Sequence, residues 1–154
     1  MTLKQLSLKQ SLNNAYRLIK PERADIEKFK SNFKLLLSHI NPKESEENMK
    51  GHVGDFLKNT YYSPNYHIAT KGRTDFVIHT GKDATHPAGV LFEAKKPSNN
   101  EMVSLANLNT KAMHEMILYY LRERIEDHNN DIEYIVVTNI YNLSNTGASN
   151  TNHS

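Results

Sequence analysis

Apolar residues recur at helical spacing near the start of the chain. Residues 3–19 hold leucine, tyrosine and isoleucine at roughly that spacing, and Pro21 separates them from a second run. In residues 26–40 the apolar positions lie 3, 4, 3, 1 and 3 residues apart. This pattern predicts an amphipathic helix with one face toward a core.

A third helix is predicted over residues 42–59. Asn41 is a suitable N-cap, Pro42 suits the first helical position, and Glu44 stands three residues after the cap, as in a capping box. The buried face of this helix is expected to consist of Met49, Val53, Phe56 and Leu57.

Beyond residue 65 the pattern becomes that of strands. Short apolar or alternating runs are bounded by glycine, proline or polar turns, and one long apolar helix follows them. The predicted strands are 66–69, 73–79, 90–95 and 132–138, and the predicted helix is 110–127. This order predicts an α/β fold with a mixed central sheet flanked by helices.

Composition divides the chain into three parts. Residues 1–40 are expected to be a helical segment packed on the core, and residues 41–141 to be the core itself. In residues 142–154, nine of thirteen side chains are Asn, Ser or Thr, so a disordered polar tail is expected there. With 154 residues, 38% of them hydrophobic and 23% charged, the chain suits one globular domain.

Absent residue types exclude several kinds of protein. There is no cysteine, which rules out disulfides, zinc fingers, iron–sulfur clusters and thiol nucleophiles. No apolar run approaches the roughly 18 residues that a membrane span needs, so we expect a cytoplasmic protein. Residues 1–73 hold 13 Lys and Arg against 7 Asp and Glu, an excess that suits either a polyanion such as nucleic acid or a solvated helix surface.

Two predicted strands place ionisable residues among apolar ones. Because side chains alternate between faces, Asp75 lies on one face of its strand, and Glu93 and Lys95 share one face of the next. If these strands form a hairpin, the three groups converge. They then form either a salt-bridge cluster at a sheet edge or a site in which the two carboxylates bind a hard cation such as Mg²⁺ or Mn²⁺.

The third helix offers another carboxylate. With about 100° per residue, Glu46 falls within the apolar stripe, Glu47 falls at its edge, and Glu44 faces away. Glu46 therefore either points across the helix–sheet interface at the carboxylate cluster or reaches solvent from the first turn. Glu47 takes this role if the helix is rotated by one residue.

The whole pattern resembles the PD-(D/E)XK nuclease core: a helix with a Glu, a strand with an Asp, a strand with acid–x–Lys, a helix and a strand. It is similar in particular to the N-terminal nuclease region of type IIG restriction enzymes, over about residues 1–141. The segments that carry this resemblance are ESEE at 44–47, FLKNTYY at 56–62, TKGRTD at 70–75, FEAKKP at 92–97, YYLRER at 119–124 and TNIY at 138–141.

The resemblance implies a restriction-endonuclease-like fold with an N-terminal helical extension, and a role for each site residue. Asp75, Glu93 and Glu46 would bind Mg²⁺, with Mn²⁺ able to substitute, and Lys95 would be the catalytic lysine. The family often has Pro where this chain has Thr74. Related nucleases place a Gln and a Tyr one turn apart on the last helix; Glu115 and Tyr119 have that spacing.

The implied function is that of a metal-dependent endonuclease in a restriction-modification system, acting on double-stranded DNA. Lys71, Arg73 and Lys96 border the expected site and are either DNA-phosphate contacts or ordinary solvated side chains. The resembling enzymes continue into adenine methyltransferase and target-recognition domains, which this chain lacks, and a homodimer stays open. The alternative function is a DNA-binding or assembly domain that does not cleave.

Overall fold

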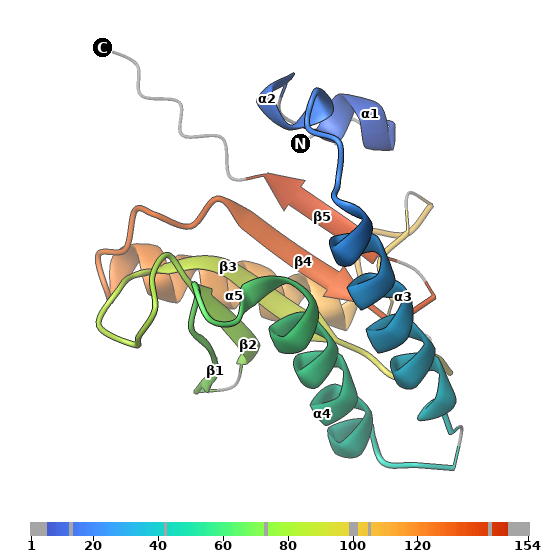
Figure 1. Cartoon of the computed structure of the whole chain (residues 1–154). Coiled ribbons are helices and arrows are strands. Elements are labelled where there is room, and N and C mark those ends of the chain that lie inside the picture. Colours follow the sequence, from blue (N-terminus) through green and yellow to red (C-terminus); the bar gives the residue numbers. More distant parts are fainter. Residues whose placement is uncertain are drawn as a thin grey trace.

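The computed structural model describes residues 6–147 except 13, 42, 73, 99–101, 105 and 142. Its centre is a five-stranded mixed sheet with the strands in sequence order, β1-β2-β3-β4-β5 (Figure 1). Only the β3–β4 pair is parallel, and the other three pairs are antiparallel. The strands are β1 (Ile68–Lys71), β2 (Thr74–His79), β3 (Ala88–Ala94), β4 (Tyr134–Thr138) and β5 (Leu143–Gly147).

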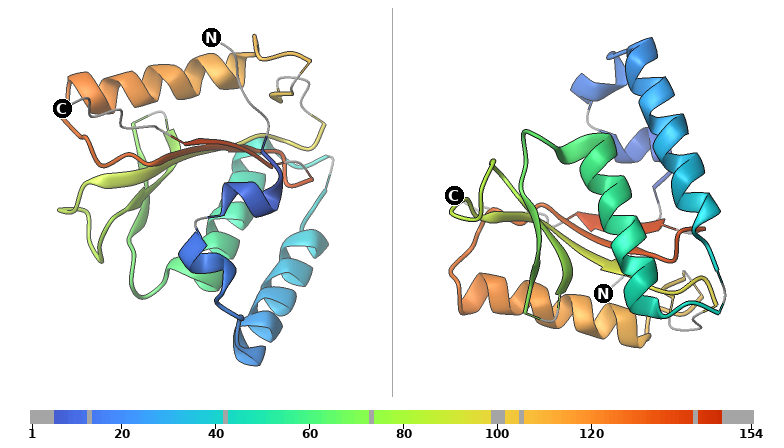
Figure 2. Two further views of the ribbon diagram at one scale, coloured as in Figure 1. Left: turned by 90° about the horizontal axis from the view of Figure 1, so that it is seen from above. Right: turned by 60° about the horizontal axis from the view of Figure 1, so that its bottom comes forward.

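Helices cover both faces of this sheet, as Figure 2 shows. Helix α5 (Lys111–Ile125) lies on one face, and α3 (Arg23–Ser38) and α4 (Glu46–Leu57) lie on the other. A π-helical segment, η1 (Lys58–Tyr62), continues α4. The prediction of an α/β fold with a mixed sheet between helices is confirmed.

The alternation of β2 and β3 divides the core into two clusters. Val77 and Leu91 are completely buried against α5, with Met116 of that helix. Phe76 and Phe92 face the opposite way and pack with α3 and α4. Burial of apolar surface on both sides of the sheet supplies the main stabilisation of the fold.

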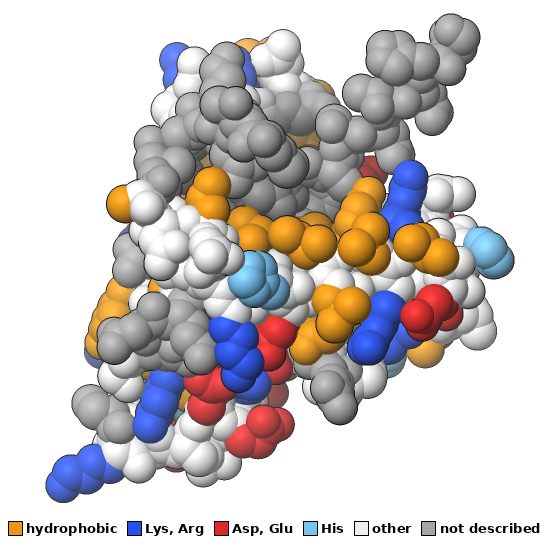
Figure 3. All heavy atoms as spheres, turned by 180° about the vertical axis from the view of Figure 1, so that it is seen from behind, with side chains coloured by type: hydrophobic (Ala, Val, Ile, Leu, Met, Phe, Trp, Pro, Cys, Tyr) orange, Lys and Arg blue, Asp and Glu red, His pale blue; other side chains and the backbone are white. Residues whose placement is uncertain are grey.

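Helix α5 provides the crossover that joins the parallel strands β3 and β4. Its inner face is buried, whereas Ile117, Leu118 and Leu121 stay exposed. On this side of the molecule a band of hydrophobic side chains crosses the surface, with acidic and basic side chains grouped beside it (Figure 3).

The predicted start of the third helix is wrong by four residues. Helix α4 begins at Glu46, and the side chain of Ser45 caps it by accepting a hydrogen bond from the Asn48 N–H. Asn41 instead forms a turn, in which its side chain accepts from the Lys43 N–H and its carbonyl accepts from the Glu44 N–H. Asn is suited to both roles, so the sequence alone did not distinguish a turn from a cap.

The N-terminal segment is less regular than its apolar pattern indicated. Its first part forms two short helices, α1 (Leu8–Ser11) and α2 (Asn14–Arg17), rather than one helix over residues 3–19. Side chains here stay exposed, including Tyr16 at 65% and Leu18 at 87%. Among the described residues of 1–40, the contact with the core is made by α3, through Phe33 and Leu36.

The polar tail differs in part from its prediction. Residues 143–147 form strand β5, which pairs antiparallel with β4 in the register Tyr134↔Gly147 to Thr138↔Leu143. The backbone of β4 offers a free edge, and any non-proline chain can pair with it, whatever its side chains. Residues 148–154 lie outside the described part of the chain. Within that part, no helix has the length and apolar character to cross a membrane.

Candidate functional site

The sheet brings the predicted acidic residues together at one end. Asp75 lies near the start of β2, Glu93 lies near the end of β3, and Lys95 directly follows β3. Since β2 and β3 are antiparallel, with Phe76 opposite Phe92, these positions are neighbours. The Ala94 N–H donates a hydrogen bond of 2.9 Å to Asp75 Oδ2, which fixes this carboxylate against β3.

Lys95 is buried between two carboxylates. Its Nζ lies 2.7 Å from Glu93 Oε1 and 3.0 Å from Glu115 Oε2 on α5. Only 5% of the Lys95 side chain is exposed. Burial by itself lowers the pKa of Lys95, but hydrogen bonds and charges from Glu93 and Glu115 outweigh it, so the pKa is raised. Lys95 therefore stays protonated at neutral pH and acts as a cationic hydrogen-bond donor rather than as a base.

Glu93 is the acid of this cluster whose ionised form is least favoured. Its side chain is 3% exposed, and no described residue hydrogen-bonds to its Oε2. Burial and the nearby charge of Asp75 raise the pKa of Glu93 to about 7, although Lys95 and Lys50 oppose the shift. A buried carboxylate oxygen without a partner costs free energy, which a proton or a bound cation would relieve.

Helix α4 adds two residues to the same cluster. Glu46 accepts a hydrogen bond of 3.4 Å from the Lys96 N–H through Oε2. Lys50, one turn further along α4, places Nζ 2.8 Å from Asp75 Oδ1 and 3.5 Å from Glu46 Oε1. Glu47 is exposed, so the structure brings Glu46 rather than Glu47 to the site.

Helix α5 closes the other side of the cluster through Glu115 and Tyr119, the pair to which the resemblance to related nucleases pointed, with Glu in place of their Gln. Tyr119 is 7% exposed. Burial raises the pKa of Tyr119, and the negative charges of Glu93, Glu115 and Asp75 raise it further. Its phenol is therefore a hydrogen-bond donor that stays protonated in this acidic environment.

Sequence reasoning missed Lys50. The signal that could have found it is its position four residues after Glu46, where two side chains share one face of a helix. Lysine on a helix surface is so common that this spacing alone carries little information. The contact with Asp75 depends on how α4 crosses the end of the sheet, which the sequence did not reveal.

The cluster contains more negative than positive charge. Four carboxylates, those of Glu46, Asp75, Glu93 and Glu115, face the two ammonium groups of Lys50 and Lys95. Exposed Lys111 lies at the edge, 3.8 Å from Glu115. The excess of acid in a largely buried place is consistent with the raised pKa of Glu93.

In the described part of the chain, no group of three or more His, Cys, Asp or Glu side chains is arranged to hold a metal ion. The three predicted metal ligands, Asp75, Glu93 and Glu46, are near one another, but lysines lie between them. Mg²⁺ needs only one or two protein carboxylates, because water and substrate phosphate complete its octahedron. Asp75 and Glu93 supply two carboxylates at this end of the sheet, and one oxygen of Glu93 has no hydrogen-bond partner among the described residues.

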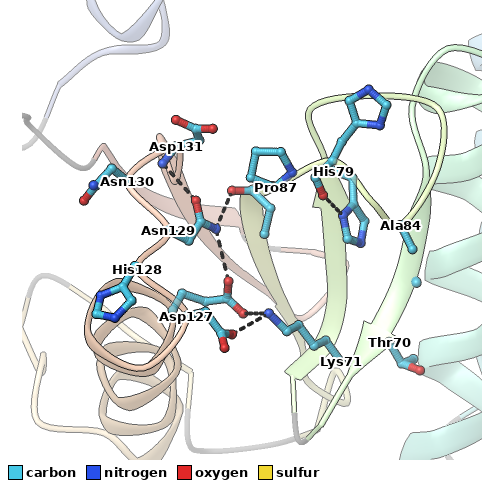
Figure 4. Close-up of a pocket in the computed structure, with 14 residues that line it drawn as sticks. Thr70, Lys71, His79, Ala84, Pro87, Asp127, His128, Asn129, Asn130 and Asp131 are labelled. Carbon is cyan, nitrogen blue, oxygen red and sulfur yellow. Dashed lines mark hydrogen bonds and ion pairs between the residues drawn. The ribbon is translucent and has the colours of Figure 1, made fainter.

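The three residues predicted to contact DNA, Lys71, Arg73 and Lys96, do not all lie at the cluster. Lys71 lies in a separate pocket of about 630 Å³ at the C-terminal end of α5, where its Nζ is 2.5 Å from Glu123 Oε1 and 2.7 Å from Asp127 Oδ2 (Figure 4). These contacts direct its ammonium toward α5, while its backbone pairs with Thr74, next to Asp75, so a DNA-phosphate contact by Lys71 stays a prediction. Lys96 does border the cluster, through its N–H bond to Glu46. Arg73 lies outside the described residues.

Comparisons with known proteins give one match. No curated protein and no solved structure matches the chain. The sequence model of a family described as a domain of unknown function, DUF7149, matches residues 6–143. The match includes every strand and helix that forms the cluster, and it covers most of the chain. The protein therefore belongs to the DUF7149 family.

Proposed function

We propose that this chain is a metal-dependent DNA endonuclease module that hydrolyses phosphodiester bonds, with a PD-(D/E)XK-type site at the end of its sheet. One feature supports this function most: Glu93 is buried beside Asp75 with one carboxylate oxygen unpartnered among the described residues, and Lys95 lies 2.7 Å from its other oxygen. Two acids and a lysine at the paired ends of β2 and β3 are the parts that such hydrolysis needs.

In this proposal Asp75 and Glu93 would hold Mg²⁺, or Mn²⁺ in its place, with Glu46 as a further ligand. The bound ion would neutralise charge on the phosphoryl oxygens and favour ionisation of a water. Lys95 is held protonated by Glu93 and Glu115, so it orients the attacking water and stabilises negative charge as a donor. Tyr119 is buried on the α5 side of the cluster.

The resemblance to type IIG restriction enzymes supplies the biological setting of the proposal. The chain would act in the cytoplasm on duplex DNA, as the nuclease part of a restriction-modification system. Target recognition and methylation would be properties of other domains. We therefore expect weak or non-specific cleavage from this chain alone.

One observation favours a second function, that of a non-cleaving DNA-binding or assembly domain. Lys50 already compensates Asp75 and Glu46, and Lys95 already compensates Glu93 and Glu115. A cluster of this kind can be a purely structural ion-pair network. In that case the residues hold α4 and α5 to the sheet end and perform no chemistry.

A plasmid nicking assay separates the two functions. The wild type, Lys95→Ala and Lys82→Ala are compared with Mg²⁺, with Mn²⁺ and with EDTA; Lys82 is an exposed lysine in the loop between β2 and β3. We expect the wild type and Lys82→Ala to nick the plasmid only with metal, and Lys95→Ala to be inactive. Equal cleavage by wild type and Lys95→Ala would refute the proposed site, and no cleavage under any condition would favour the binding domain.

A further inference from the structure

Lys50 is more buried than an ordinary surface lysine and contacts carboxylates of the candidate site. Its side chain is 18% exposed and reaches from α4, on one face of the sheet, to the end of β2. There Nζ contacts Asp75 Oδ1 at 2.8 Å and Glu46 Oε1 at 3.5 Å. Both of these carboxylates are metal ligands in the proposed function, so the ammonium lies between two of the groups that would bind the ion.

A divalent ion and this ammonium would compete for Asp75 Oδ1. An ion on that carboxylate would lie about 2.1 Å from an oxygen that Lys50 already contacts at 2.8 Å. At such a separation two cations repel each other by several kcal/mol, even at the intermediate dielectric constant of a protein surface. The ion therefore binds more tightly when Lys50 moves away from Asp75. Its four-carbon stem is flexible enough for the ammonium to turn toward solvent.

We infer that Lys50 is a built-in counter-ion that occupies the place of the divalent cation and competes with it for Asp75 and Glu46. The inference rests on the proposed metal-dependent function and goes beyond it. In the absence of metal the ammonium neutralises carboxylates that would otherwise repel one another. In its presence the ammonium leaves, so part of the ion's binding energy is consumed in breaking the Lys50–Asp75 pair.

Calorimetric titration of the full chain with Mn²⁺ tests this competition. The variants are Lys50→Gln, which removes the charge, and Lys50→Arg, which keeps it. Lys30→Gln is the matched control, because it breaks an exposed ion pair of 3.0 Å with Glu27 on α3, away from the site. We expect Lys50→Gln to bind Mn²⁺ about tenfold or more tightly than the wild type, and Lys50→Arg and Lys30→Gln to match the wild type.

Thermal unfolding of the same variants gives a second readout. Lys50→Gln should be less stable than the wild type in EDTA and should gain more from Mn²⁺ than the wild type gains. If Lys50→Gln does not fold in EDTA, recovery of its folded circular dichroism spectrum on addition of Mn²⁺, and not of equivalent potassium chloride, supports the inference. Failure to recover overturns it.

The outcomes separate this inference from the proposed function. If the wild type binds Mn²⁺ and Lys50→Gln binds it equally or more weakly, Lys50 does not compete with the ion, but the metal site stands. If neither protein binds Mn²⁺, the metal-dependent function fails, and the inference about Lys50 fails with it.

Discussion

Glu93→Gln should stabilise the metal-free protein, although it removes a charged residue from a buried ion pair. Glutamine has nearly the shape of protonated glutamate and can keep a hydrogen bond from Lys95, which retains Glu115 as a charged partner at 3.0 Å. The substitution removes the ionised form of a carboxylate that is 3% exposed and has an unpartnered oxygen. Glutamine therefore avoids the cost of keeping this charge buried.

The raised pKa gives the magnitude of this effect. The pKa of Glu93 is about 7, against 4.5 for an ordinary glutamate. At roughly 1.4 kcal/mol per pKa unit, the ionised side chain costs up to about 3 kcal/mol at pH 8, where both folded and unfolded forms are ionised. The amide has hydrogen bonds of its own to satisfy, so we expect a gain of about 2 kcal/mol. For a chain of this size, this is a rise of about 4–8 °C in Tm.

The size of the effect depends on pH. The unfolded carboxyl loses its proton near pH 4.5 and the folded one near pH 7, so the contribution of Glu93 to stability falls as pH rises through this window. Below pH 4.5 Glu93 is protonated in both the folded and the unfolded state, so it no longer lowers the free energy of unfolding. The difference between Glu93→Gln and wild type should therefore shrink to less than about 1 kcal/mol at pH 5.

Urea and thermal unfolding in EDTA at pH 5 and pH 8 measure this difference. Glu133→Gln, at an exposed glutamate just before β4, is the matched control and should show no comparable gain. A Glu93→Gln protein that is less stable than the wild type at pH 8 would refute the reasoning. So would a difference in stability that does not change with pH.

Two further changes test the site and the fold. Asp75→Asn keeps an acceptor for the Ala94 N–H but loses the negative charge that would bind the ion, so Mn²⁺ binding measured by calorimetry should weaken at least tenfold; unchanged binding would place the metal elsewhere. Ser45→Ala removes the cap of α4 and should lower the free energy of unfolding by about 1 kcal/mol, measured by urea denaturation. A larger loss from Asn41→Ala would contradict the assigned helix start.

The strand pattern predicted the centre of the site well, because side-chain alternation and hairpin pairing are local properties. Asp75, Glu93 and Lys95 share one end of the sheet, where strand periodicity placed them. The helical wheel placed Glu46 within the apolar stripe and Glu47 at its edge, and the structure brings Glu46 to the site, although the predicted start of the helix was wrong. The phase of a helix depends only on the spacing of its apolar residues, whereas its first residue depends on a single cap.

Contacts between distant segments were harder to predict. The pairing of Lys71 with Glu123 and Asp127 joins β1 to the end of α5, and no local pattern records which basic residue reaches which acid. Lys50 contacts Asp75 only because α4 crosses the sheet near the start of β2. Strand β5 was missed because its partner is the backbone of β4, whereas composition describes side chains.

A crystal of the wild type soaked with Mn²⁺ tests the central claim most directly, since the anomalous signal locates the ion. We expect one strong peak at about 2.1 Å from oxygens of Asp75 and Glu93, with Lys50 displaced from Asp75. A map with no peak at this end of the sheet, and with Lys50 still 2.8 Å from Asp75 Oδ1, would contradict it.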